Sequence, residues 1–319
     1  MRRMRTYLLK RVLSLVPTLI GVTILIFLMM RMIPGTVVDQ LIGTEGRADE
    51  ATKAAMRAFF GLDQPLYVQY WRWVSGVLVG DFGQSWRSGL PVGKMIFDRL
   101  AVTAELGLLA LLISLLVGIP LGTLSAVREN TMLDHVARIV SLFSLSVPIF
   151  WQAAMLILAL SLWFNWVPPV DFASPVRDPL ANLTQMLLPA VVLGTVVAAQ
   201  VMRMTRASLL DVLRHDYVRT ARAKGLAEGL VVRRHAFKNA LIPIITVIGV
   251  QIGYLLGGAV VTEQVFTLPG VGRLVLDAVV QRDYPLIQGT ILFIALLFML
   301  SNLVVDLLYA YLDPRIRYE

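Results

Sequence analysis

Residues 12–30 read Val12-Leu-Ser-Leu-Val-Pro-Thr-Leu-Ile-Gly-Val-Thr-Ile-Leu-Ile-Phe-Leu-Met-Met30, a run without a single charged side chain. A helix needs roughly 20 apolar residues to cross the hydrocarbon core of a bilayer, and buried helices of soluble proteins are seldom so long and so apolar. Five further uncharged runs follow, at residues 106–127, 139–170, 179–202, 239–262 and 284–305. The sequence therefore predicts an all-α integral membrane protein with six transmembrane helices.

The overall composition agrees with this prediction. Charged residues make up only 16% of the 319 residues and the mean hydropathy is +0.73, whereas soluble domains average about 25% charged residues. Membrane orientation and contact with anionic lipid explain the net charge of +8, so nucleic acid is not expected as a partner. Cysteine is absent, which excludes disulfides and cysteine-ligated metals.

Two of the runs depart from the simplest pattern. The first follows a basic start, as a signal peptide does, but it is longer than the apolar core of such peptides and no small-residue cleavage site follows it. We therefore predict an uncleaved first helix. The third run, 139–170, is too long for one span, and its end, Trp166-Val-Pro-Pro169, is expected to leave the membrane.

Lysine and arginine are distributed unevenly between the two sides of the predicted membrane. With the N-terminus inside, the inner segments carry eighteen basic residues and the short outer loops carry three. Basic residues concentrate in short cytoplasmic loops, whereas long loops weigh little in this bias. Both the N-terminus and the C-terminus are therefore predicted to be cytoplasmic.

We expect the chain to form a single membrane domain, 1–319, with an extracytoplasmic insertion at residues 33–99. The insertion is rich in turn residues and aromatics, and short amphipathic helices are predicted at 48–60 and 67–79. The second would lie at the membrane interface, where Trp and Tyr prefer to lie. The insertion forms either a lipid-facing aromatic belt or an external cap that contacts a partner.

Small residues recur at every fourth position in three of the predicted helices. The sets are Ala110, Ser114, Gly118, Gly122 and Ala126; Ala190, Gly194 and Ala198; and Gly249, Gly253 and Gly257. This spacing places each set on one helix face, so that two backbones can approach closely. The stripes either pack within this chain or meet a second membrane subunit.

The sequence lacks the motifs of membrane metalloproteases and of P-loop ATPases. Its histidines form no H-E-x-x-H pair and no lysine is followed by Ser or Thr, so a P-loop is absent. Ionisable residues inside spans mark ion pathways, but here Glu105 and Asp306 lie only at span ends. We therefore expect no catalytic, cofactor or metal site in this chain, and no coupling to protons.

The predicted cytoplasmic segment 203–240 is too long for a simple turn. It contains Tyr217-Val-Arg-Thr-Ala-Arg-Ala-Lys-Gly225, in which Arg219 and Arg222 lie three residues apart on a similar helix face. A short helix with a face of small residues can lodge in a groove of another protein while its arginines reach acidic rims. The alternative is a basic loop that lies on anionic lipid.

This stretch resembles the coupling signature of bacterial importer permeases, a degenerate E-A-A-x-x-x-G. Arg219, Thr220 and Ala221 occupy its first three places and Gly225 the glycine, and the arginine stands where many relatives have glutamate. Other segments are similar to the first permease subunit of dipeptide/oligopeptide ABC importers: Arg31-Met-Ile-Pro-Gly35, Gly61-Leu-Asp-Gln-Pro65, Gly80-Asp-Phe-Gly83, Arg234-His-Ala-Phe-Lys-Asn-Ala-Leu-Ile-Pro243, Val265-Phe-Thr-Leu-Pro-Gly-Val-Gly272 and Leu312-Asp-Pro-Arg-Ile-Arg-Tyr318.

The resemblance implies a heterodimeric pore in the bacterial plasma (inner) membrane. The partners would be a second permease subunit, two ATP-binding subunits that hold ATP and Mg, and an extracytoplasmic solute-binding protein. The coupling residues would be Arg219, Thr220, Ala221, Arg222 and Gly225. Relatives import dipeptides, oligopeptides, nickel complexes or glutathione, and the sequence does not give the cargo. The alternative is a secondary carrier that works without an ATPase.

Overall fold

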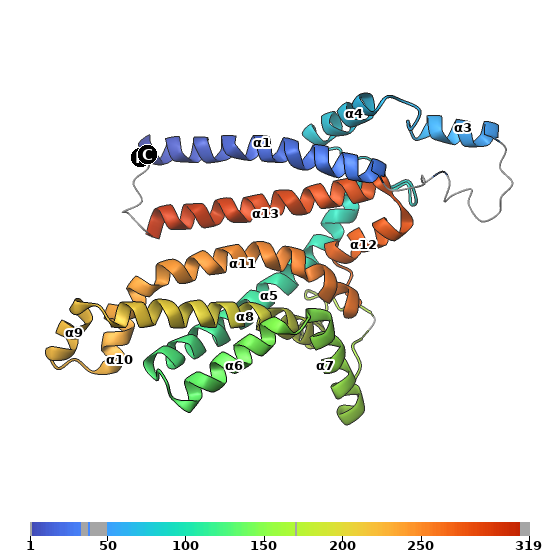
Figure 1. The fold of residues 1–319 in the computed structure, drawn as a ribbon. Helices are drawn as coiled ribbons and strands as arrows, with labels where there is room; N and C mark the ends of the chain where they lie inside the picture. Colours follow the sequence, from blue (N-terminus) through green and yellow to red (C-terminus); the bar gives the residue numbers. More distant parts are fainter. Residues whose placement is uncertain (1, 33–37, 39–49, 170, 313–319) are drawn as a thin grey trace. The chain divides into compact units, whose positions relative to one another are not determined.

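The structure, a computed structural model, describes residues 2–32, 38, 50–169 and 171–312, and it places the side chains of residues 13–32, 38, 51–169, 171–255 and 259–305 (Figure 1). These residues are almost entirely helical; an isolated antiparallel bridge pairs Gln84 with Pro91. The chain divides into two compact units, Met1–Val102 with Pro269–Met299, and Thr103–Leu268 with Leu300–Arg317. Our prediction of a single membrane domain stays a prediction.

The first unit contains α1 (Arg2–Met32), α3 (Glu50–Phe59), α4 (Leu66–Leu78) and α12 (Val271–Gln281). The second contains α6 (Met132–Ser146), α7 (Ile149–Phe164), α8 (Pro179–Leu213), α9 (Asp216–Ala223), α10 (Glu228–Leu230), the π-helical turn η2 (Val231–Ala236) and α11 (Phe237–Val265). Two long helices, α5 (Val92–Val127) and α13 (Tyr284–Leu312), contribute residues to both.

Five of the described helices contain stretches long and apolar enough to cross a membrane: Leu13–Met32, Val92–Val127, Pro179–Leu213, Glu228–Leu255 and Tyr284–Val305. The pair α6 and α7 passes the same criteria together, with a bend of 105° between the two helices. The predicted all-α fold of six spans is confirmed with this pair as the third, broken span. The third run is therefore two helices, whereas the sequence predicted one.

Proline explains the break in the third span. Pro148 has no backbone N–H and its ring clashes with the preceding turn, so a helix is interrupted there. The Nε2 of Gln152 donates to the carbonyl oxygens of Ser144 at 3.0 Å and Val147 at 2.9 Å. An unpaired carbonyl in an apolar environment is costly, and membrane helices tolerate proline only when the freed groups are bonded again. Gln152 therefore stabilises the bend.

The observed helix ends shift the predicted boundaries of the two loops. The short helices predicted at 48–60 and 67–79 are confirmed as α3 and α4. The end of the predicted insertion, 92–99, belongs to α5, and α8 continues past residue 202 to Leu213. Residues 33–37 and 39–49 of the insertion lie outside the described part of the chain.

In the second unit the small-residue stripes bring helices close together. A Cβ added to Gly118 would lie 2.8 Å from the carbonyl oxygen of Ala198, and one added to Gly122 would lie 2.6 Å from that of Met202. The stripes of α5 and α8 therefore pack on each other within this chain. A Cβ on Gly249 would meet Val305 of α13. Gly253 is buried, and the surroundings of Gly257 lie outside the described residues.

Candidate functional site

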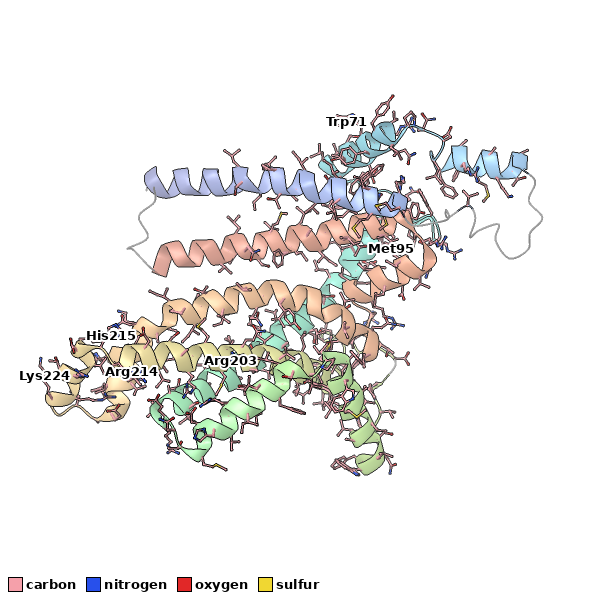
Figure 2. The ribbon with its side chains drawn as sticks, in the orientation of Figure 1. Trp71, Met95, Arg203, Arg214, His215 and Lys224 are labelled. Carbon is pink, nitrogen blue, oxygen red and sulfur yellow. The ribbon has the colours of Figure 1, made fainter. Side chains whose placement is uncertain are left out.

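The segment between α8 and α11 folds as a short helix held at the end of the second unit. The helix α9 begins after His215, whose backbone is extended, and Asp216 in its first turn complements the positive end of the helix dipole. It ends before Gly225, whose φ of +78° is a left-handed conformation that glycine adopts most cheaply. Figure 2 shows Arg214, His215 and Lys224 gathered around this helix.

One face of α9 is anchored in the protein's own core. Val218 and Ala221, three residues apart and therefore on one face, are 0% and 5% exposed. They belong to a hydrophobic cluster together with Ala126, Leu209, Val212, Val231, Ala236, Ala240 and Ile244. The small-residue face predicted for docking thus includes an alanine that points inward. Because this side chain is buried, it is not available to another protein. Ala221 instead packs α9 against α8 and η2.

The opposite face of α9 is exposed and carries the other predicted residues. Thr220 Oγ1 donates to the carbonyl oxygen of Asp216 at 3.0 Å, and Arg219 lies 3.5 Å from the Asp216 carboxylate. Both pairs are local to the helix, so the arginine remains accessible. Such exposed ion pairs stabilise a protein by about 0–1 kcal/mol.

Arg222 closes the loop that follows α9. Its Nε and Nη2 donate to the two carboxylate oxygens of Glu228, at 3.0 and 2.6 Å. The hydrogen bonds to this carboxylate raise the pKa of Arg222, so the guanidinium stays charged at all working pH values. This bidentate pair holds the two ends of the loop between Arg222 and Glu228 together. Gly225 lies at the turn of this loop.

The structure also holds the segment to the neighbouring spans through polar contacts. Asn239 Nδ2 donates to the Tyr217 hydroxyl at 2.7 Å, which ties α9 to α11. Arg206 of α8 binds both carboxylate oxygens of Asp134, at 2.7 and 2.8 Å. Asp134 is completely buried and also accepts from Ser125 and from the backbone N–H of Asn130.

Sequence reasoning missed three acids that are buried among the described residues. Asp134 lies in a predicted loop and Glu263 lies just beyond a predicted span, and the structure places Glu263 in the last turn of α11, where it bonds Thr103. In the first unit, buried Asp283 accepts from the Ser85 hydroxyl and the Trp86 backbone N–H. An acid in a short loop with a matching arginine far away in sequence carries no local signal of burial.

No cluster of His, Asp and Glu among the described residues is arranged to hold a metal ion. The arrangement is an exposed basic helix whose buried face packs against α8, η2 and α11.

Comparison with protein families gives two matches that together span nearly the whole chain. Residues 118–318 match the family described as binding-protein-dependent transport system inner membrane component. Residues 4–107 match the N-terminal membrane component of the same systems.

Curated relatives and solved structures point the same way. The chain is 41% identical over 339 residues to the dipeptide transport system permease protein DppB of Escherichia coli (strain K12), with 99% of this chain and 100% of the relative covered. It is 42% identical over 316 residues to the glutathione transport system permease protein GsiC of Salmonella paratyphi A, with the same coverage. The MetNI methionine ABC transporter, in an inward facing conformation, matches with a TM-score of 0.57 at 16% identity over 69% of this chain and 96% of that one. This last likeness shows the fold alone.

Proposed function

The chain belongs to the family of binding-protein-dependent transport system inner membrane components, and from this premise we propose that it forms one half of the pore of an ATP-driven importer. It is a multi-pass subunit of the inner membrane and a permease of the ABC type. The family therefore supports this function over a secondary carrier. The cargo, the partners and the coupling residues are the parts that we propose.

We propose that α9 is the contact with an ATP-binding subunit. The observation that carries this proposal is the division of α9 into a buried face, Val218 and Ala221, and an exposed basic face. A force applied to Arg219, Thr220 or the turn at Gly225 passes into the cluster that joins α8, η2 and α11. Differential contact with two states of the ATPases would then shift the population of two pore conformations.

The proposed assembly contains a second permease subunit, two ATP-binding subunits and an extracytoplasmic solute-binding protein. ATP and Mg would be held by the ATP-binding subunits, where the hydrolysis takes place. The N- and C-termini of this chain would be cytoplasmic, because the basic residues concentrate on that side.

The proposed cargo is a dipeptide, an oligopeptide or a related small solute. This proposal rests on the relatives, one of which is described as a dipeptide permease and another as a glutathione permease.

The substitution Gly225→Asp tests the coupling role. Nothing lies within 4 Å of a Cβ built at Gly225, so the added carboxylate meets no other part of this chain, while the φ of +78° strains the turn when any side chain is added. We expect uptake of a labelled dipeptide by the reconstituted importer to fall to background, while membrane insertion of this chain is unchanged.

The control is Gly229→Asp, since Gly229 also has open space around its Cβ and a negative charge added there lies in the same segment. We expect this variant to insert and to transport. Wild-type uptake in Gly225→Asp, with normal insertion, would contradict the proposed role of the turn.

A further inference from the structure

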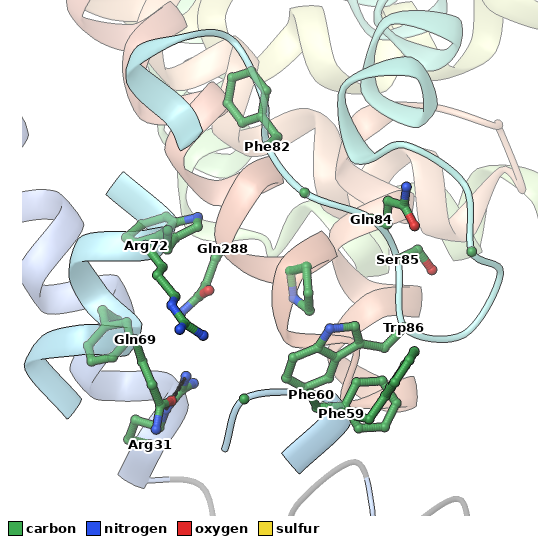
Figure 3. Close-up of a pocket in the computed structure, with 16 residues that line it drawn as sticks. Arg31, Phe59, Phe60, Gln69, Arg72, Phe82, Gln84, Ser85, Trp86 and Gln288 are labelled. Carbon is green, nitrogen blue, oxygen red and sulfur yellow. Dashed lines mark hydrogen bonds between the residues drawn. The ribbon is translucent and has the colours of Figure 1, made fainter. Parts of the chain in front are cut away.

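The first unit contains a cavity of about 480 Å³ that has no role in the proposed function. It is lined by α1, the residues at the end of α3, α4, the turn at residues 82–89 and the beginning of α13. Figure 3 shows Arg31, Gln69, Arg72 and Gln288 along one side, and Phe59, Phe60 and Trp86 along another. The lining residues include two arginines and no acidic residue.

Three hydrogen-bond donors of this cavity are buried without a partner among the described residues. They are Nη1 of Arg31, Nε1 of Trp73 and Nε2 of Gln288. The other nitrogens of Arg31 are engaged, because Nε and Nη2 both donate to Gln69 Oε1 at 3.1 and 2.5 Å. Buried polar groups are nearly always hydrogen-bonded. Three unsatisfied donors in one cavity therefore indicate a missing acceptor.

The charge of the cavity specifies what kind of acceptor is missing. Arg31 lies over the rings of Phe27 and Tyr284, at 4.6 and 5.5 Å from their centroids, and it forms no ion pair with a carboxylate of the described residues. A half-buried guanidinium without a counter-ion is costly. An anionic group with several oxygen acceptors would satisfy both the charge and the free donors.

The position of the cavity favours an anion that belongs to a membrane. Arg31 is in the last turn of the span Leu13–Met32, and Gln288 is in the first turns of the span Tyr284–Val305. Ends of spans lie at the depth of lipid headgroups, where arginine side chains meet the interface.

The helix α4 supports the same depth. Its inner face follows one stripe of α1, with Tyr70 bonded to Thr23 at 3.0 Å and Trp73 stacked on Phe27. Its other face exposes large apolar and aromatic side chains, Leu66, Tyr67, Trp71 and Leu78, which are 51–76% exposed. Trp71 projects away from the helix in Figure 2. An aromatic face of this kind suits the interface of a bilayer.

We propose that this cavity binds the phosphate headgroup of an anionic phospholipid such as phosphatidylglycerol. The phosphate oxygens accept from Arg31, Gln288 and Trp73, and the glycerol and first acyl carbons contact the aromatic wall of Phe60 and Trp86. A bound headgroup fastens α4 and the turn at residues 82–89 to the ends of α1 and α13. The proposal does not depend on which cargo the importer carries.

The test uses the complete importer, reconstituted in nanodiscs of phosphatidylcholine with a minor fraction of phosphatidylglycerol. The importer is then extracted into mild detergent, and native mass spectrometry counts the phosphatidylglycerol molecules that it retains. Gln288→Glu places a carboxylate among the free donors, where it repels phosphate while giving Arg31 a counter-ion. We expect this variant to retain about tenfold less phosphatidylglycerol, because it loses one charge-assisted contact, with a thermal midpoint no lower than that of the wild type.

Arg87→Gln is the matched control, since Arg87 is exposed in the same segment and does not line the cavity. It removes one positive charge and should retain phosphatidylglycerol as the wild type does. Trp73→Phe, which removes the indole N–H and keeps a ring, should reduce retention as well. Equal retention by the wild type and Gln288→Glu would overturn the proposal. The proposal would also be overturned if inorganic phosphate or a dipeptide raised the thermal midpoint of the importer in detergent while no phosphatidylglycerol was retained.

Discussion

At the scale of single residues, the most consequential feature is the buried pair of Asp134 and Arg206. The carboxylate is completely buried, and its two oxygens are bonded by a guanidinium from a helix that lies 72 residues later in the chain. Removing one partner of a buried ion pair leaves the other charge without compensation, which is more costly than the net stabilisation that the pair provides. This pair fixes α6 against α8, next to the cluster that anchors α9.

We expect Asp134→Asn to lower the stability of the second unit by about 3 kcal/mol, since Arg206 would lose its counter-ion in a largely buried site. The thermal midpoint of the purified complex measures this loss. Glu129→Gln is the control, because Glu129 and Arg214 form an exposed pair at 3.3 Å, and such pairs are worth about 0–1 kcal/mol. Equal midpoints for the two variants would show that Asp134 is not a structural anchor.

At the scale of elements, close contact between helix backbones decides the packing of the second unit. In lipid the hydrophobic effect gives little drive for helices to associate, so tight contact between small residues contributes much of the attraction. Gly118 and Gly122 of α5 meet the backbone of α8, and α8 itself contacts α6 and α11. The central position of α8 is therefore a consequence of which glycines face it.

We expect Gly118→Ala to destabilise the packing of α5 on α8 by about 1–3 kcal/mol, because the new methyl group would overlap backbone atoms that cannot move independently. The control lies on the same helix. A Cβ on Gly107 meets nothing within 4 Å, and Gly107→Ala should be neutral or stabilising, by up to about 1 kcal/mol, through better helix propensity. Thermal unfolding of both variants, followed by the loss of intact complex, distinguishes them. A Gly118→Ala variant as stable as Gly107→Ala would contradict the observed contact.

At the scale of the whole molecule, the prediction concerns the orientation in the membrane. The chain contains no cysteine, so single cysteines report their side directly. We expect Thr220→Cys, on the exposed face of α9, to react with a membrane-impermeant maleimide only in inverted vesicles, prepared without the ATP-binding subunits that we propose cover this face. Ser88→Cys, in the exposed turn of the first unit, should react only in intact spheroplasts. Labelling of both positions from the same side would show that the predicted topology is wrong.

The helical, membrane-spanning nature of this protein could be predicted from its sequence because it rests on local properties. Uncharged runs such as 12–30 and 284–305 must satisfy their backbone groups internally in lipid, and a helix does this without reference to the rest of the chain. The basic segment that forms α9 could also be recognised in the sequence, because Gly225 and the arginines before it are local features.

The tertiary structure decided everything that depends on a partner distant in sequence. The sequence could not tell whether the glycine stripes of α5 and α8 meet each other, nor that Ala221 points into the core. It could not show that Asp134 is buried with Arg206, or that Gln152 replaces the bonds lost at Pro148. Likewise, Arg31, Trp73 and Gln288 share a cavity only because α1, α4 and α13 come together. Periodicity fixes the face on which a residue lies, whereas burial and pairing depend on which helix covers that face.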